Sequence, residues 1–285
     1  AKYDYRKLGE TWSTPRIIRI KVSGKDKWVA VFGGGYNGAV NPNVGSAVFV
    51  MDLEDEGRLL KAIDIGDTSA DIVNSLPADL SVITADGTNK ANYNGAMIYA
   101  TDLEGKVTKI NLTDQGTLYQ STTLFTAEST SANGRYIYTR PEVTINNDNN
   151  LWLYFGTGNT QKLQAQSSQV KNRLYGIKDK DFPNFVTVSP PGDVSKCKTA
   201  PTCPGGSDLG WYVNLKKSQK LTAEPTVDKD RVYFPIYEPT AANNKCGTGI
   251  AILMAYDTKC GNSVLNVIMG KGVLSKVVKQ GDNLY

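Results

Sequence analysis

The hydrophobic positions of this chain fall in short runs, separated by polar and glycine-containing turns. The runs are rich in β-branched and aromatic residues, the composition typical of β-strands. The clearest runs are Trp28–Phe32, Ala47–Met51, Met97–Ala100, Leu151–Phe155, Val232–Ile236 and Ile250–Tyr256. No window has the 3.6-residue periodicity of an amphipathic helix. The pattern therefore predicts an all-β fold.

A weak internal repeat groups these strands into hairpins. In each copy an apolar strand ends in Asp, a polar or Gly-containing turn follows, and a second strand begins. The copies are centred on Asp52, Asp102 and Asp257, with a poorer copy at Asp179. Asp52 and Asp102 are 50 positions apart, and Asp257 follows Asp102 by 155, close to three such units. A strand repeat of ~50 residues predicts a β-propeller, with a β-sandwich as the alternative.

Composition excludes several kinds of chemistry. The 285-residue chain is long enough to bury a core, and it contains no histidine. It therefore has no imidazole general base, no histidine-ligated zinc and no Ser-His-Asp or Cys-His catalytic group. No pair of carboxylates stands out from the sequence as a catalytic pair.

Charge is spread unevenly along the chain. Residues 1–160 contain 15 basic and 18 acidic residues, whereas residues 161–285 contain 17 basic and 10 acidic residues. A basic second half could meet an acidic partner, and a solvated lysine-rich face is the alternative reading. The lysines are scattered rather than clustered, so we expect no nucleic-acid binding.

Four cysteines suggest an oxidising compartment. Cys197 and Cys203 lie in a loop rich in Pro, Gly and Lys, and Cys246 and Cys260 bracket the last apolar run. We interpret them as two local disulfides, Cys197–Cys203 and Cys246–Cys260. Four cysteines allow three connectivities, and four reduced thiols in a cytosolic protein are the alternative.

Several segments in a fixed order carry a family resemblance. From residue 8 to about residue 261 the chain contains, in order, LGETWSTP, WVAVFGGGYNG, AVFVMDLEDEGRLL, MIYATDLEGKVTKINL, RPEV, YFGTG, LYGI, GWYVNL and GTGIAILMAYDTKCG. This ordered set resembles the C-terminal β-propeller of the PilC/PilY family, whose members are associated with the tip of type IV pili. Each segment alone is weak, and the order makes the resemblance specific.

The resemblance implies a modified or incomplete propeller with antiparallel hairpin blades, part of a larger seven-bladed-type ring. Residues 1–285 would then form a single β-propeller domain or the C-terminal portion of one. At the ~50-residue period the chain would hold roughly four or five hairpin units. We therefore expect a fragment of a longer protein, whose upstream domain or a partner covers the exposed strand edges.

The resemblance also implies a function without catalysis. Family members support pilus assembly, oppose retraction, and contribute to adhesion, twitching motility and virulence. The implied partners are minor pilins of the pilus tip complex, a host-cell surface receptor and the upstream domain of the same protein. The implied location is extracellular, at the pilus tip and associated with the outer membrane of a Gram-negative bacterium, after export through the periplasm.

Many family members carry a calcium loop before the strand that matches MIYATD, and the matching loop here is Thr84–Gly95. Calcium takes six to eight oxygen ligands, which alternating Asp and Asn residues can supply. The resemblance therefore marks five residues as calcium ligands: Asp86, Thr88, Asn89, Asn92 and Asn94. Because only one is a carboxylate, a degenerate polar loop is the alternative.

Two other polar segments look like turns rather than sites. The acidic run Asp52–Glu56 could attract a cation, but a hairpin turn splays its side chains, so we expect a solvated turn. Asn146–Asn150 is expected to form an Asx-rich hairpin turn.

The aromatic and glycine positions are interpreted as packing. Gly33–Gly35 lack the strand–loop–helix context of a nucleotide site, so we expect these glycines to let strands crowd near the propeller axis. Tyr36 and Trp12 are expected to pack between blades. Trp211 and Tyr212 could be exposed adhesive aromatics, and core packing is the favoured role.

Two alternatives remain beside the pilus function. One is a fragment of a periplasmic or extracellular propeller enzyme, either a quinone-dependent dehydrogenase or a glycosidase. A cofactor spectrum or hydrolysis of glycosides would favour it. The other is a generic periplasmic scaffold that binds a protein partner, and a pull-down with minor pilins would distinguish it from the pilus protein.

Overall fold

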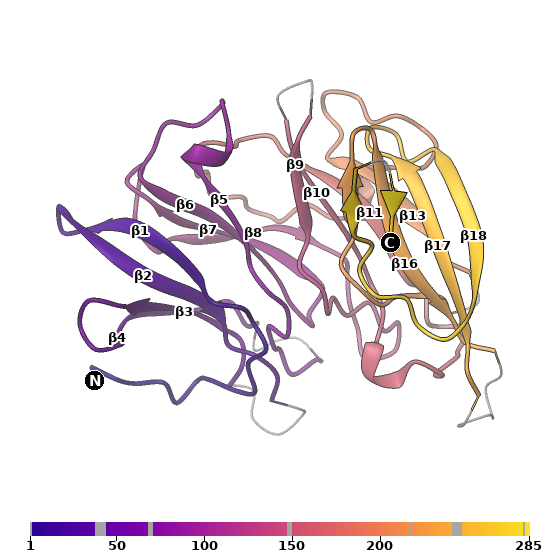
Figure 1. Ribbon diagram of the computed structural model, residues 1–285, viewed down its shortest axis with the longest axis horizontal. Helices are drawn as coiled ribbons and strands as arrows, with labels where there is room; N and C mark the ends of the chain where they lie inside the picture. The colour runs from indigo at the N-terminus through magenta and orange to yellow at the C-terminus, as the bar shows by residue number, and fades with distance from the viewer. Residues whose placement is uncertain are drawn as a thin grey trace.

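The computed structural model describes residues 2–37, 44–67, 71–146, 150–216, 218–240, 247–281 and 283–285. Four largely antiparallel sheets follow one another along the chain, and a short C-terminal hairpin lies beside the last of them (Figure 1). Helical structure in the described residues is limited to three 3₁₀ turns: η1 (Ala85–Gly87), η2 (Thr160–Lys162) and η3 (Val194–Lys196). No helix in this part of the chain is long and apolar enough to cross a membrane.

The first two sheets are simple four-stranded meanders. Sheet 1 consists of β1 (Arg16–Val22), β2 (Lys25–Gly33), β3 (Ala47–Asp52) and β4 (Arg58–Asp64). Sheet 2 consists of β5 (Ser81–Thr84), β6 (Gly95–Thr101), β7 (Lys106–Thr113) and β8 (Ser121–Thr126).

The last two sheets vary this plan. Sheet 3 runs in the order β12 (Cys197–Thr199), β13 (Gly210–Asn214), β11 (Arg173–Asp179), β10 (Leu151–Gly156) and β9 (Glu142–Ile145), with β12 parallel to β13. Sheet 4 contains β14 (Lys220–Leu221), β15 (Thr226–Asp228), β16 (Arg231–Glu238), β17 (Ile250–Asp257) and β18 (Ser263–Lys271). The C-terminal hairpin is β19 (Lys279–Gln280) with β20 (Asn283–Leu284).

Hydrophobic cores lie between successive sheets. One cluster joins sheets 1 and 2, a second joins sheets 2 and 3, and a third joins sheets 3 and 4. Inner strands therefore serve two cores at once: Leu153 and Phe155 of β10 face the second cluster, whereas Trp152 and Tyr154 face the third. A strand that is covered on both faces has a continuous run of apolar residues in its sequence. This arrangement is the blade stacking of a β-propeller, so the predicted fold class and all six predicted strands are confirmed.

The strand-ending aspartates hold the turns between strands. Asp52, Asp179 and Asp257 end β3, β11 and β17, and Oδ1 of each accepts the backbone N–H two residues later. Each of these is the third strand along the hydrogen-bonded path of its sheet, counted from β1, β9 and β14. Such an Asx turn supplies an acceptor for a backbone donor that the ladder leaves unpaired.

Asp102 is not equivalent to these three residues, so the predicted 50-residue repeat is wrong. It follows the second strand of sheet 2 rather than the third, and its Oδ1 accepts from the Lys106 N–H at 2.9 Å. Both kinds of turn need an acceptor for a backbone N–H, and Asp supplies it in either. The true repeats begin at β1, β5, β9 and β14, and they are longer than 50 residues.

A buried ion pair connects sheets 2 and 3. Lys109 Nζ lies 2.6 Å from Asp179 Oδ2, and both side chains are 1% exposed. The same carboxylate oxygen accepts from the Tyr99 hydroxyl at 2.6 Å, while Asp179 Oδ1 accepts from two turn N–H groups. Burial, and then the Asp179 charge, raise the pKa of Tyr99 well above its ordinary value. The carboxylate is thus fully hydrogen-bonded, as a buried charge requires.

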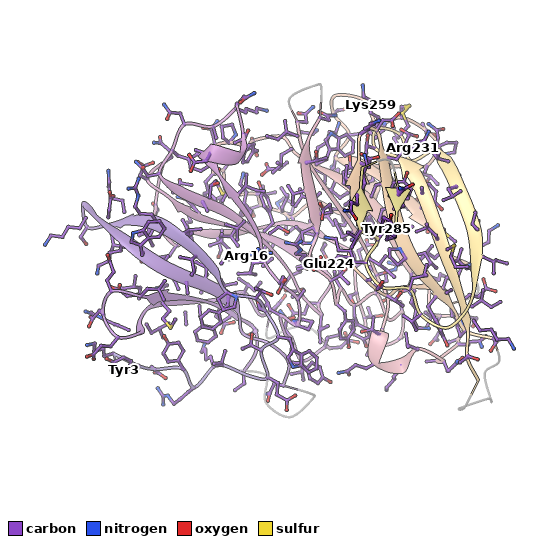
Figure 2. The ribbon with its side chains drawn as sticks, viewed as in Figure 1. Tyr3, Arg16, Glu224, Arg231, Lys259 and Tyr285 are labelled. Carbon is purple, nitrogen blue, oxygen red and sulfur yellow. A yellow bond between two sulfur atoms is a disulfide. The ribbon has the colours of Figure 1, made fainter. Side chains whose placement is uncertain are left out.

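Further ion pairs join sheets 3 and 4 near the middle of the molecule. Glu224 lies there (Figure 2), 3.0 Å from Arg140 Nε and 3.0 Å from Lys276 Nζ. Lys276 also approaches Glu142 of β9 at 3.4 Å. Next to it, Val277 is buried against Tyr233 and Ala255 of sheet 4. The C-terminal segment thus packs back on the last sheet.

The disulfide pairing differs from both predicted local pairs. Cys203 is bonded to Cys260, 57 positions later, so Cys197–Cys203 and Cys246–Cys260 are wrong. The bond joins the long β12–β13 loop of sheet 3 to the β17–β18 turn of sheet 4. The segment between β11 and β13 and the β17–β18 turn meet at one edge of adjacent sheets, so residues far apart in sequence become neighbours.

The other two cysteines are not part of this bond. Cys197 is unbonded and half-buried at the start of β12, and burial raises the pKa of its thiol to about 12. Cys246 lies outside the described residues.

Candidate functional site

Strand alternation sorts the loops onto two faces of the molecule. Loops between first and second strands, and between third and fourth strands, form one face, called here the upper loop face. In Figure 1 this face is at the top for sheets 3 and 4, whereas the β1–β2 and β3–β4 loops of sheet 1 lie at the left. Loops between second and third strands, and connections between sheets, form the lower loop face. The predicted calcium loop belongs to the upper face, and the largest cavity described below opens on the lower face.

The predicted calcium loop joins β5 to β6 and is anchored to its own sheet. It begins with η1, where the Thr88 N–H donates to Ala85 O at 3.1 Å. Tyr93 is buried beneath the loop, and its hydroxyl donates to Ile83 O at 2.9 Å. Burial raises the pKa of Tyr93 to about 12. The loop geometry therefore rests on an aromatic anchor and on backbone hydrogen bonds.

Two of the five proposed ligands, Thr88 and Asn94, are engaged in hydrogen bonds with protein groups. Thr88 Oγ1 accepts from the Lys90 N–H at 3.1 Å, and Asn94 donates from both its backbone and side-chain nitrogens to Asp114. Asp86 and Asn94 instead line a cavity of about 270 Å³ beside β1 and β2, whose walls include Ile17, Arg19 and Trp28.

The donor set of this loop does not match calcium chemistry. Calcium needs six to eight oxygens, normally including several carboxylates, and this loop supplies one, Asp86. Across the described ranges, no three Asp, Glu, His or Cys side chains are grouped so that they could hold a metal ion. We therefore derive no calcium-dependent step from these residues.

The acidic turn after β3 is tied to its neighbours. Asp52 is buried rather than solvated, 2.6 Å from Lys27 Nζ. Asp55 lies 2.7 Å from Lys2 Nζ, and Glu56 accepts from the Tyr3 hydroxyl at 3.2 Å. These contacts fasten the N-terminal segment to sheet 1. Asp52 and Asp55 are therefore engaged in ion pairs, and the solvated turn expected for Asp52 is wrong.

The other predicted turn agrees with the structure at its two ends. The Asn146 N–H donates to Asn150 O at 3.1 Å, and Asn146 Oδ1 accepts from the Asn150 N–H at 3.2 Å. Residues 147–149 of this turn lie outside the described residues.

The glycine-rich segment after β2 has the predicted packing role. Gly35 has a φ of +86°, and a Cβ there would lie 2.3 Å from Glu10 O, so any side chain would be both strained and obstructed. Tyr36 is half-buried, and its hydroxyl donates to Gln161 of the β10–β11 loop at 2.8 Å. Trp12, in contrast, is 72% exposed, so its predicted packing between blades is wrong.

The two aromatic residues of β13 are packing residues. Trp211 is completely buried, and its indole N–H donates to Thr258 O at 3.1 Å. Tyr212 is half-buried, with the Arg173 guanidinium 5.2 Å above its ring. The core-packing interpretation of Trp211 is confirmed.

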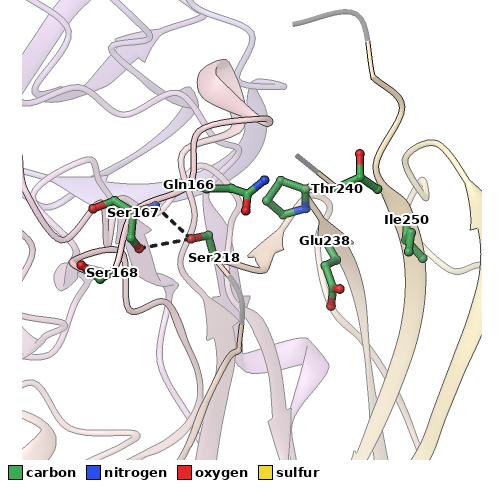
Figure 3. A pocket seen from close by; sticks show the side chains of 8 residues that line it. Gln166, Ser167, Ser168, Ser218, Glu238, Thr240 and Ile250 are labelled. Atoms are coloured by element: carbon green, nitrogen blue, oxygen red, sulfur yellow. Dashed lines mark hydrogen bonds between the residues drawn. The ribbon is translucent and has the colours of Figure 1, made fainter. Parts of the chain in front are cut away.

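The larger cavity of the lower loop face lies between sheets 3 and 4 (Figure 3) and measures about 470 Å³. Its walls carry mostly hydroxyl and amide groups, including Gln166, Ser167 and Ser218. Ser218 Oγ accepts from the Ser167 N–H and donates to Ser167 O, both at 3.3 Å. Glu238 is the one carboxylate among the lining residues, and it accepts from Gln219 Nε2 at 2.6 Å. A glycosidase needs two opposed carboxyl groups, and this lining supplies one.

Comparison with known proteins supports the family resemblance. No family model matches the chain. A type IV pilus biogenesis factor PilY1 homolog from Xylella fastidiosa is 25% identical over 297 residues, covering 92% of this chain and 19% of that protein. The chain therefore spans about a fifth of the length of this relative.

The fold resembles a solved propeller of the same name. The crystal structure of the Pseudomonas aeruginosa PilY1 C-terminal domain aligns with a TM-score of 0.64 and 17% identity, covering 90% of this chain and 60% of that one. A europium-containing methanol dehydrogenase aligns more weakly, with a TM-score of 0.46 and 12% identity. The chain thus resembles the C-terminal propeller of PilY1 in sequence and in fold.

Proposed function

We propose that this chain, similar in sequence and fold to the C-terminal propeller of PilY1, is a module of a type IV pilus biogenesis factor. The observation that carries the proposal is the similarity to the Xylella PilY1 homolog across 92% of the chain. Because the chain covers 19% of that relative, the activity of the whole protein is part of the proposal.

The module acts by binding rather than by catalysis. The sequence contains no histidine. Three buried carboxylates, Asp52, Asp102 and Asp179, already have a lysine partner and a turn N–H. Groups held in this way support the fold and are poorly placed to exchange protons with a substrate.

The finer parts of the function concern the pilus tip. The module supports assembly together with minor pilins, opposes retraction, and contributes to adhesion to a host-cell receptor and to twitching motility. It works outside the cytoplasm, where the Cys203–Cys260 disulfide would persist. The basic second half of the chain offers complementary charge to an acidic partner.

The test is a chromosomal deletion of the segment that encodes this chain, made in a wild-type strain and in a strain unable to retract pili. Loss of surface pili in both strains, with loss of twitching in the strain that retracts, would support a role in assembly. Loss of surface pili only in the strain that retracts would indicate that the module opposes retraction. Unchanged pili and unchanged twitching, with the truncated protein still exported, would contradict the proposal.

A further inference from the structure

A second, smaller cavity lies on the lower loop face beside sheet 3. It measures about 130 Å³ and is enclosed by the connection from sheet 2, the β10–β11 loop and the start of β14. Its polar lining residues are Ser131, Tyr136, Asn159, Lys162 and Lys220. All residues of this lining belong to the described part of the chain.

Lys220 is a buried cation without a carboxylate partner among the described residues. Its side chain is almost completely buried, and Nζ donates to Ala165 O at 2.8 Å and to Ser218 O at 3.1 Å. An ammonium group has three donors, so one remains. Lys109 is equally buried, yet it has Asp179 at 2.6 Å. Burying a charge without a counter-ion is costly, so the difference between the two lysines requires an explanation.

The backbone makes room for this lysine. A Cβ at Gly158 would lie 2.6 Å from the Lys220 Cβ, so only glycine fits beside it. Burial lowers the pKa of Lys220 to about 8, and the amine is therefore still mostly protonated at neutral pH. The position thus holds a positive charge next to a cavity, inside a packed interface between two blades.

Further donors line the cavity. Lys162 is exposed, and no ion pair of its side chain is found in the described ranges. Asn159 Oδ1 accepts from the backbone N–H groups of Gln161 and Lys162, which leaves its side-chain amide nitrogen as a donor. The nearby carboxylate of Asp71 is already held by the Ser131 N–H and hydroxyl, at 3.0 and 2.7 Å.

We infer that this cavity binds a single carboxylate group, held by Lys220 from inside and by Lys162 at the rim. Lys220 supplies the one buried ammonium, whereas the Lys162 charge at the rim is exposed and screened by solvent. A monoanion therefore fits the interior, and a dianion such as sulfate would bring an unmatched buried charge. The small volume admits a group of only a few heavy atoms. The carboxylate comes either from a small organic acid or from an acidic side chain of a protein partner. This inference does not depend on the pilus function.

The experiment is a ¹H–¹⁵N NMR titration of the chain at pH 7, with chloride replaced by acetate at constant ionic strength. We expect saturable shifts confined to residues 131–136, 159–170 and 218–221. A four-atom ligand has a small binding energy, so dissociation constants of about millimolar are expected. Parallel titrations use N-acetylglutamate amide, which presents the group as a protein side chain would, and inorganic sulfate, which is a dianion at pH 7. Tighter binding of the glutamate derivative identifies a protein partner, and tighter binding of acetate a small acid.

Variants distinguish binding of acetate in the cavity from general attraction of anions to a basic surface. Lys220→Met removes the buried ammonium group, so it should weaken acetate binding by tenfold or more. A tenfold loss corresponds to about 1.4 kcal/mol of binding free energy. Lys162→Gln should weaken it about twofold to fivefold, as expected for an exposed charge. Lys171→Gln, an exposed lysine of the same loop outside the cavity lining, is the matched control and should leave it unchanged.

Three results would overturn the inference. They are an absence of saturable shifts with acetate, equal affinity of wild type and Lys220→Met, and binding of sulfate as tight as that of acetate. If Lys220→Met does not fold, Lys162→Gln and Asn159→Ala decide the question. Both exchange residues outside the core, and unchanged acetate affinity in both would likewise reject the site.

Discussion

Buried charges show most clearly how individual residues determine this structure. Lys109 and Asp179 neutralise each other between sheets 2 and 3, whereas Lys220 has only carbonyl oxygens as partners in the described chain. Neither lysine stands out in the sequence, because both lie in ordinary strand-like segments. Their roles depend on which carboxylate or cavity the neighbouring blade brings to them.

Replacing Asp179 by Ala should strongly destabilise the protein. The substitution leaves Lys109 and Tyr99 without their buried acceptor, which typically costs about 3–5 kcal/mol. Urea unfolding of the variant and the wild type measures the difference. Asp26→Asn is the matched control, because Asp26 is half-exposed and 3.9 Å from Arg19, and its loss should cost at most about 1 kcal/mol. Similar losses for the two variants would contradict the structural role given to Asp179.

Lys220 should make the free energy of unfolding rise with pH in the alkaline range. Its pKa is about 8 in the folded protein, against the ordinary lysine value of 10.5 that applies to the unfolded chain. Between these values the unfolded chain holds a proton that the folded protein has released, so raising the pH favours folding. The full effect is on the order of 3 kcal/mol, and it should be absent in Lys220→Met.

Urea unfolding of the wild type and of Lys220→Met at pH 7.5, 8.5 and 9.5 tests this expectation, and the comparison removes the ionisation of the tyrosines that the two proteins share. The wild type should gain stability relative to Lys220→Met over this interval. Parallel pH profiles of the two proteins would show that Lys220 is not desolvated as the structure indicates.

At the scale of elements, the loops decide how blades are joined and what they can bind. The β17–β18 turn accepts hydrogen bonds from Tyr154 and Trp211 of sheet 3 through Thr258 O, and it carries one end of the disulfide. The β5–β6 loop, in contrast, makes its hydrogen bonds within sheet 2.

Removing the disulfide should destabilise the fold without changing it. The bond closes a segment of 57 residues, for which the loss of unfolded-chain entropy corresponds to about 4 kcal/mol. The double variant Cys203→Ser/Cys260→Ser should lose stability on this scale in denaturant unfolding, and a reductant should then have no further effect. Cys197→Ser, which removes the unbonded thiol, should respond to reductant as the wild type does. A wild type unaffected by reductant would contradict the assigned bond.

Calcium should have little effect on the β5–β6 loop. With one carboxylate, and with Thr88 and Asn94 engaged in other hydrogen bonds, the loop lacks the ligands for tight binding. Calorimetric titration with calcium chloride should give no binding heat, and Tm should not change relative to magnesium chloride. A saturable calcium signal that Asp86→Asn abolishes would show that the loop is a genuine metal site.

At the scale of the molecule, four stacked sheets share three cores in the arrangement of propeller blades. The last sheet is partly covered by the C-terminal segment, where Thr226 Oγ1 donates to Val277 O at 2.6 Å. The outer strand β18 is exposed along nearly all of its length, although its residues include Val267, Ile268 and Met269. The sequence pattern alone gives no reason for apolar residues to be exposed there.

The strands and the fold class followed from the sequence because each inner strand is buried on both faces. That burial demands a continuous apolar run, and the run is visible without knowing its neighbours. The turn aspartates were visible for the same local reason, since each satisfies N–H groups of its own turn. The family resemblance added the order of these segments along the chain.

Which turns are equivalent, which cysteines meet and which lysines acquire a counter-ion were decided only by the tertiary structure. Asp102 resembles the other turn aspartates locally but lies between different strands. Cys203 finds Cys260 because successive blades bring their loops to one edge, and Lys220 faces a cavity because sheets 3 and 4 meet there. Local sequence determines what a segment needs, namely burial, a turn or a hydrogen-bond partner. The stacking of blades determines which distant residue supplies it.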